Sequence, residues 1–389
     1  MALVSAREHI GIASQATSRS AATAFNLVPA DAGSFSATET FEQILDTGRR
    51  GSEAMDYRSF KGVGSTELTF DFPMMWGTSS SATTGCTLGT LLRNILGTGA
   101  PAISGTATLP TRAVRVASTD NHQTFLRLGT THEYLTVTRE LLNNVDGDMY
   151  ERWKDCRVSS LTISANAGEG AITCSASLTG HTTAYSSSNP AIGTKSISDN
   201  IALGFENAYI STARFQPFLF GNSVYSSDQN NAANRIISFE VTLSREITPI
   251  YTMANNLNFN DVYLGPLEVT FNVVAEIAKA DIDDVRANTI GKTVVGFSTA
   301  AVAGAAYNET GARSLIIGMQ ATSPLEAPLE IDTSASYATV SYSGRALATS
   351  DALAISGDAY TGSDDTRRTP IEIEIQEHGA SGSASPTYA

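Results

Sequence analysis

The stretch TELTFDF at residues 66–72 decides the fold class of this chain. Leu68, Phe70 and Phe72 alternate with polar residues, so a period of two places the apolar side chains on one face. Pro73 follows directly and ends the segment. The pattern predicts a β-strand with one buried face and one polar face.

A second stretch, LEVTFNV at residues 267–273, alternates in the same way. When residues 67–72 are laid on residues 268–273, three positions are identical. Because a six-residue match is weak alone, the order of the neighbouring elements carries more of the argument.

That order repeats after each stretch. Leucines at helical spacing predict a helix over residues 87–96, ended by Gly97. An acidic first turn predicts another over residues 281–289, ended by Gly291. The repeated order favours an internal duplication. It predicts a first unit with an N-terminal arm at residues 1–190, and a second unit with a polar, flexible C-terminal end at residues 191–389.

The rest of the chain is also β-rich. Further strands are expected at residues 24–28, 124–128, 134–138, 156–164, 171–178, 235–243, 313–319, 337–343 and 371–375. Residues 124–128 are expected to pair with 134–138, and the turn at 165–170 is expected to join its flanking strands in a hairpin. Residues 143–153 are expected to be helical or looped, and residues 181–200 to form a linker. The predicted fold class is mainly β.

Composition excludes several functions. The 389 residues are 42% hydrophobic and only 16% charged, with a formal net charge of −14. An acidic chain is a poor sequence-independent nucleic-acid binder and is not expected to dock on anionic lipid. No signal peptide and no membrane span is expected. Cys86, Cys156 and Cys174 are too sparse for a disulfide framework, so each is expected to be a small buried apolar residue.

No motif for catalysis or for a cofactor stands out. None of the five histidines lies three to five residues from another His or from a Cys, and no nucleophile elbow or phosphate-binding loop is present. Asp146 and Asp148 are better explained by a turn, and the acidic residues 281–284 by a helix start. The sequence therefore predicts no catalytic residue, no metal site and no cofactor.

A polar surface is the remaining functional feature. It is predicted from the polar faces of the alternating strands, including residues 371–375. Its candidates are Glu67, Thr69, Asp71, Glu268, Thr270, Asn272, Glu372 and Glu374. Such an acidic, hydroxyl-bearing surface could line a water-filled channel and repel a polyanion. An ordinary solvated outer face is an equally good interpretation of these strands alone.

The order of elements resembles that of the tail tube (major tail) proteins of long-tailed bacteriophages. The similarity spans roughly residues 31–346. It is carried by residues 57–72, 88–96, 153–164, 171–180, 235–241 and 265–273. The run from Trp153, through Cys156-Arg157-Val158 and a glycine turn, to Gly180 is typical of one branch of that family.

The resemblance implies units of β-sandwich type, each with a flanking helix, whose sheets join between subunits into a β-barrel and a tube of stacked rings. Members with two fused units form trimers with pseudo-sixfold symmetry, so a trimer is favoured over a hexamer here. Loops before each alternating strand, at residues 46–60 and 245–261, would reach the next ring. Their candidate residues are Arg49, Arg50, Asp56, Tyr57, Tyr251, Asn255, Asn256 and Asn258.

The expected function is therefore a structural virion protein: a tail tube, assembled in the host cytoplasm, that conducts double-stranded DNA without binding it specifically. The implied partners are further copies of the chain, the tape-measure protein, the tail terminator and the distal tail proteins, with no membrane. A two-sandwich adhesin or virion decoration protein is the alternative, and it predicts a stable monomer. An enzyme whose site is assembled only in the fold is a third possibility, disfavoured by the missing motifs.

Overall fold

The computed structural model shows a mainly β chain with nineteen strands and one helix in the part that it describes. The described residues are 8–15, 17–46, 58–76, 87–97, 111–115, 121–129, 131–142, 148–166, 172–186, 189–192, 201–202, 236–253, 257–276, 282, 286, 291–298, 314–334, 338–348 and 369–378.

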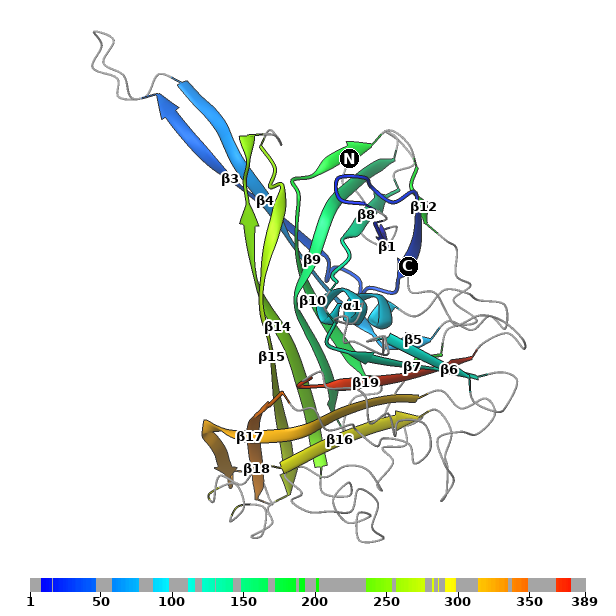
Figure 1. The fold of residues 1–389 in the computed structure, drawn as a ribbon, viewed down its shortest axis with the longest axis vertical. Coiled ribbons are helices and arrows are strands. Elements are labelled where there is room, and N and C mark those ends of the chain that lie inside the picture. Colours follow the sequence, from blue (N-terminus) through cyan, green and yellow to red (C-terminus); the bar gives the residue numbers. More distant parts are fainter. Residues whose placement is uncertain are drawn as a thin grey trace, which may run out of the picture.

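The main sheet contains eight antiparallel strands, in the order β3-β4-β10-β9-β14-β15-β18-β17 (Figure 1). Their bounds are Ser36–Asp46 (β3), Arg58–Pro73 (β4), Thr173–Gly180 (β10), Met149–Asn166 (β9), Ile236–Ile250 (β14), Asp261–Glu276 (β15), Thr339–Ala346 (β18) and Ser314–Asp332 (β17). One face of this sheet carries alternating apolar residues and is buried. On β15, for example, Val269, Phe271 and Val273 are buried.

A first side sheet branches from the N-terminal half of β9. Its strands are β11 (Ala184–Ser186), β8 (Leu135–Leu141), β1 (Glu8–Ser14), β2 (Ala24–Val28) and β12 (Ala191–Ile192), and only the β12–β2 pair is parallel. β9 can serve two sheets because it is kinked at Asp155, whose φ of 52° lies in the left-handed region.

A second side sheet branches from the N-terminal half of β17. It contains β16 (Gly291–Ser298), β19 (Glu372–His378), β7 (Asn121–Arg127) and β6 (Thr111–Arg115). β19 lies between β17 and β7, so it joins the two halves of the chain. Two short strands, β5 (Met75–Trp76) and β13 (Ile201–Ala202), pair separately.

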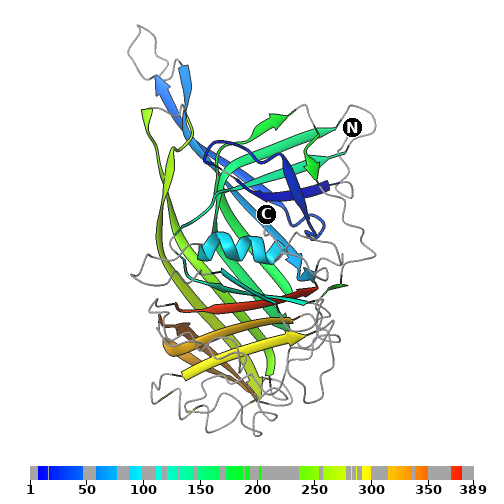
Figure 2. The ribbon, with the colours of Figure 1, turned by 45° about the vertical axis from the view of Figure 1, so that its right-hand side comes forward.

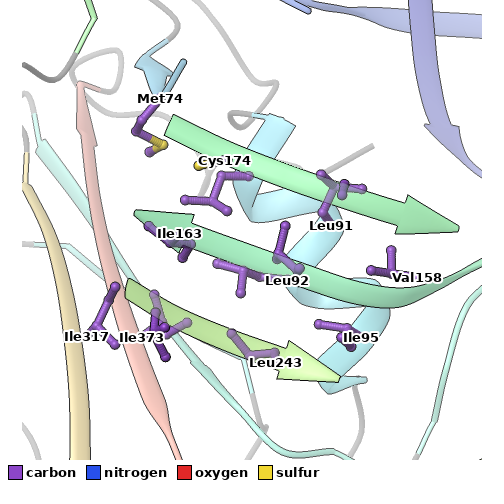
Figure 3. Close-up of a cluster of buried hydrophobic side chains, with 14 of the residues drawn as sticks. Met74, Leu91, Leu92, Ile95, Val158, Ile163, Cys174, Leu243, Ile317 and Ile373 are labelled. Carbon is purple, nitrogen blue, oxygen red and sulfur yellow. The ribbon is translucent and has the colours of Figure 1, made fainter. Parts of the chain in front are cut away.

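Helix α1 (Thr87–Leu96) lies across the apolar face of the main sheet (Figure 2). Leu91, Leu92 and Ile95 point toward β9 and β14, and Ile317 and Ile373 of the second side sheet pack from beside (Figure 3). Gly97, with φ 86°, ends the helix, and its amide donates to Arg93 O at 2.9 Å. One apolar core therefore runs through both halves of the chain.

The two halves follow the same pairing order. In the first half the β3–β4 hairpin is followed by β10 and then β9, whose other end pairs with β8 and β11. In the second half the β14–β15 hairpin is followed by β18 and then β17, whose other end pairs with β16 and β19. The alternating strands β4 and β15 thus occupy corresponding positions.

Most of the expected elements are confirmed, including the helix at residues 87–96 and the β9–β10 hairpin. The expected pairing of residues 124–128 with 134–138 is wrong, because β7 pairs with β6 and β19 while β8 pairs with β1 and β9. Residues 149–153 are strand rather than helix or loop. The expected linker at residues 181–200 contains β11 and β12.

The C-terminal part and the second helix fall largely outside the described residues. β19 shows that the segment after residue 350 includes a paired strand as well as the polar stretch that the sequence indicates. In the segment expected as a second helix, only Ile282 and Arg286 are described, and both are helical.

Candidate functional site

The polar face of β4 lies opposite its buried apolar face. Glu67 and Asp71 are exposed and Thr69 is half-buried, whereas Leu68 and Phe70 are buried. This split follows from the period of two, since successive side chains point to opposite sides of a sheet. The predicted orientation of this strand is confirmed.

β15 presents the corresponding residues on the same face of the main sheet. Glu268 is exposed, and Thr270 and Asn272 are half-buried. Thr270 lies opposite Thr242 of β14 on one side and Arg345 of β18 on the other. The polar face therefore continues across strands from both halves.

The strands between β4 and β15 fill this face with hydroxyl groups. The Oγ1 atoms of Thr162 and Thr242 lie 2.9 Å apart across the β9–β14 pair, and Ser164 Oγ lies 2.7 Å from Thr173 Oγ1 across β9–β10. The sequence analysis identified these strands but not this contribution. The alternation of Ser and Thr with apolar residues in residues 158–164 and 173–179 could have revealed it.

Charge on this face is mainly acidic. The described acidic residues on it are Glu67, Asp71, Glu240, Glu268, Glu276, Glu330 and Asp332. Arg345 is their cationic neighbour, and its Nη2 lies 2.5 Å from Glu268 Oε1. Both partners are about half exposed, so this ion pair contributes little to stability.

Glu372 and Glu374 do not share the polar face of the main sheet. They belong to β19 in the second side sheet, where Glu372 is buried between Ile371 and Ile373. The side chain of Glu374 lies outside the described residues. Six of the eight predicted positions therefore lie together, on β4 and β15.

Two long hairpins project from the main sheet (Figure 1). The first arm comprises residues 39–46 and 58–65, and the second arm comprises residues 245–253 and 257–265. Both arms carry exposed apolar side chains. These are Phe41, Ile44, Leu45 and Phe60 on the first arm, and Ile250, Tyr251, Met253, Leu257 and Tyr263 on the second.

The predicted loops, at residues 46–60 and 245–261, overlap the described parts of these arms. The stretch 245–261 is not a single loop, because β14 continues to Ile250. Tyr251 is exposed, and Asn258 is anchored to the first half of the chain. The other predicted positions lie outside the described residues: Arg49, Arg50, Asp56, Tyr57, Asn255 and Asn256.

The second arm, near its tip, meets the first arm near its base. Gly64 N donates to Leu257 O at 2.9 Å, and Gly64 pairs with Asn258 in a parallel bridge. A Cβ at Gly64 would lie 2.8 Å from Thr40 O of the neighbouring strand β3, so glycine is needed at this position of the β3–β4 pair.

A cationic cluster lies at the base of the second arm. Arg245 Nη1 lies 3.3 Å from His132 Nε2, and the Arg157 guanidinium lies 3.7 Å from the centre of the Tyr134 ring. Burial, with the positive charge of Arg245, lowers the pKa of His132 to about 4. Tyr134 donates to Asp261 Oδ1 at 2.5 Å, and burial raises the pKa of Tyr134 to about 12.

The two described cysteines are free and buried. Cys156 and Cys174 are buried thiols, as predicted, and burial raises the pKa of each. Cys86 lies outside the described residues. Within the described ranges, no group of three or more His, Cys, Asp or Glu is placed to hold a metal ion, and no helix has the length and apolarity to span a membrane.

Comparison with known families gives one informative match. A family model described as phage tail tube protein matches residues 5–346. β19 lies beyond the matched residues. No curated protein matches the chain significantly.

Proposed function

The chain belongs to the phage tail tube protein family, structural proteins of the virion tail, and we propose that it polymerises as stacked rings around a bore lined by the polar face. The observation that carries this proposal is the continuous polar face across strands of both halves. The family is structural rather than enzymatic, which favours this function over a site for catalysis.

Ring formation is supported by the edges of the main sheet. Among the described strands, β3 and the C-terminal half of β17 each lack a partner on one side. Such edges present unpaired backbone groups that pair readily with another chain. The β9–β14 pairing, which runs from Ser238 opposite Asn166 to Ser244 opposite Ser160, supports the proposal that the edge strands of neighbouring chains pair in the same way.

A trimer follows from the repeated pairing order. If each half is one tail tube unit, three chains would bring six units into a ring with pseudo-sixfold symmetry. The unit boundary near residue 190 belongs to this proposal, although β12 and β13 pair with strands of the first half. Pro324 and Pro328 in β17 would restrict which strand pairs there, because proline cannot donate to a ladder.

The polar face suits the passage of DNA in two ways. Its carboxylates repel phosphates, and its hydroxyl groups hold water without offering the cationic contacts on which nonspecific DNA binding depends. The lining that we propose comprises Glu67, Thr69, Asp71, Glu268, Thr270 and Asn272, with the hydroxyl residues between them. Glu372 is left out because it is buried.

The arms would contact the next ring. Their exposed apolar residues favour burial of the arms against a second copy of the chain. At the two ends of the tube, the arms or the surfaces that receive them would contact the tail terminator and the distal tail proteins. The tape-measure protein would occupy the bore. Genome ejection through this bore completes the proposed role.

Electron microscopy of the purified full chain tests the proposal. Hollow rods or three-lobed rings, with threefold and pseudo-sixfold symmetry in averaged images, are expected as the concentration rises. A chain that stays monomeric at all concentrations, even after addition of preformed tail ends, would move the weight to the two-sandwich binding module. Sixfold rings of six chains would retain the tube and overturn the trimer.

A further inference from the structure

Residues 257–259, which lead from the tip of the second arm back to the main sheet, attach this arm to the first half of the chain. Phe259 is fully buried, although Met253 and Leu257 nearby in the same arm are exposed. Its ring meets the His181 ring edge to face at a centroid distance of 4.4 Å. A buried aromatic residue close to an exposed tip indicates a docking point rather than a free loop.

His181 makes the central polar contact of this docking point. Its Nε2 donates to Phe259 O at 2.9 Å and lies 3.2 Å from Asp155 Oδ2. The side chain is buried, and burial lowers the pKa of His181, which favours the neutral ring with its proton on Nε2. One side chain thus connects the backbone of the second arm to a carboxylate of the first half.

The position of His181 is set by its neighbours in the chain. His181 N donates to Lys154 O at 2.9 Å. A Cβ at Gly180 would lie 2.5 Å from Cys156 Sγ, so glycine is needed for this approach to the kink of β9.

Asp155 is held by a buried network at that kink. Its Oδ1 accepts from Gln15 Nε2 at 2.6 Å and from Arg19 N at 2.8 Å. Gln15 Oε1 in turn accepts from Asp155 N at 2.6 Å and from Thr136 Oγ1 at 3.0 Å. These hydrogen bonds hold the Asp155 carboxylate in place, so His181 contacts an immobilised group.

Two flanking contacts complete the attachment. Asn258 Oδ1 accepts from Thr182 N at 3.0 Å and from Thr182 Oγ1 at 2.9 Å. Leu257 O accepts from Gly64 N in the first arm. Three successive residues of the second arm, 257–259, are therefore tied to the first half and to the other arm.

We propose that His181 is a positioning residue that locks the second arm against the first and so sets the direction in which both arms leave the ring. This inference rests on the proposed function of the arms in ring stacking. A two-stranded ribbon is marginally stable in water and bends easily, so its own ladder would not hold a fixed direction. The contacts of His181 with Phe259 and Asp155, here called the anchor, would fix the direction that the two strands alone do not fix.

The test compares His181→Phe, which keeps a ring without the donor, with His181→Gln, which keeps an N–H donor. Hydrogen exchange of the Gly64 and Thr182 amides is measured in the unpolymerised chain. His181→Phe is expected to speed exchange at both amides about tenfold, and His181→Gln is expected to stay within about twofold of the wild type. His9→Phe is the control, because His9 also faces a carboxylate but is half exposed.

The same variants are then polymerised and imaged. His181→Phe is expected to raise the concentration needed for tubes about tenfold and to give irregular stacking, with rescue in His181→Gln. Unchanged exchange in His181→Phe would overturn the anchor. Fast exchange with normal tubes would overturn its role in stacking. A wild-type chain that forms no tubes counts against the proposed function instead, and the exchange rates still decide the anchor.

Asn258→Ala guards against a His181→Phe chain that fails to fold. Asn258 is half-buried, and its replacement removes only the contacts to Thr182. Faster exchange at the Gly64 amide is expected here too. Unchanged exchange at Gly64 in this variant would show that the Thr182 contacts are not part of the attachment.

Discussion

The two arms are corresponding hairpins that are attached to the rest of the protein in different ways. Below the second arm, residues 238–244 of β14 pair with β9 on one side and β15 on the other, whereas β3, which continues into the first arm, has only β4 as its partner among the described strands. The second arm is also docked through Phe259, and the first arm runs out beyond the sheet (Figure 1). The comparison teaches that an edge position leaves an arm available to another chain, and an internal position makes it part of the body.

The largest effect is expected from a substitution that disrupts the pairing of β14 with β9 inside the main sheet. Val241→Asp places a carboxylate at a fully buried position of β14, which should lower the free energy of unfolding by about 4 kcal/mol or more. Thermal and urea unfolding, followed by circular dichroism, measure the loss. Thr242→Asp is the matched control, since its side chain lies on the polar face of the same strand. Equal losses in both variants would contradict the assignment of the two faces.

A smaller loss is expected where the arms meet. In Gly64→Ala the new Cβ would meet Thr40 O at 2.8 Å, and a backbone atom cannot move aside as a flexible side chain does. We expect the free energy of unfolding to fall by about 1–3 kcal/mol. Gly265→Ala in the second arm is the control, because its nearest neighbour is Glu246 Cβ at 3.1 Å. A more stable Gly64→Ala chain would show that the β3–β4 pair has room for a Cβ at this position.

Acid should loosen the base of the second arm. The folded pKa of His132 is about 4, below the ordinary 6.5, so the unfolded chain takes up a proton that the folded chain refuses. Stability from this group is complete above about pH 6.5 and is lost as the pH falls toward about 4. The loss should be about 1–2 kcal/mol, because the half-buried ring is partly screened by solvent.

Urea unfolding at a series of pH values measures this loss. His132→Gln should remove that part of the pH dependence. The base of the first arm offers a contrast, since its Lys61–Glu39 ion pair is exposed and involves no histidine. A pH profile that is the same with and without His132 would remove His132 as its cause.

The smallest effect on folding is expected at the free arm. Phe41→Ser replaces an exposed ring, so the free energy of unfolding should change by no more than about 0.5 kcal/mol. Polymerisation followed by light scattering should nevertheless require a higher concentration. Tyr263→Ser is the matched change on the second arm. If Phe41→Ser polymerises like the wild type, the first arm is not the contact that we propose.

The sequence was sufficient for elements that carry their own periodicity. β4, β15 and α1 were predicted closely because alternating or helical apolar residues are visible without any partner. The polar positions on β4 and β15 followed from the same alternation. The free thiols Cys156 and Cys174 were also expected to be buried.

Contacts between distant segments could not be predicted in this way. Residues 156–163 and 234–241 look alike, but in the structure β9 and β14 are paired neighbours, and β17 holds the position that corresponds to β9. His181 fell in an expected linker, and its contact with Phe259 leaves no periodic signal. Glu372 looked like an outward-facing residue because the alternation in residues 371–375 does not reveal that β19 lies between β17 and β7, where Glu372 is buried.

The double membership of β9 has a mechanical consequence. A load along this strand is shared by the ladders to β10 and β14 at one end and to β8 and β11 at the other. Those ladders resist in shear, with many hydrogen bonds strained at once, rather than opening one bond at a time. The kink at Asp155 therefore couples the main sheet to the first side sheet, so neither sheet can slide along β9 without pulling on the other.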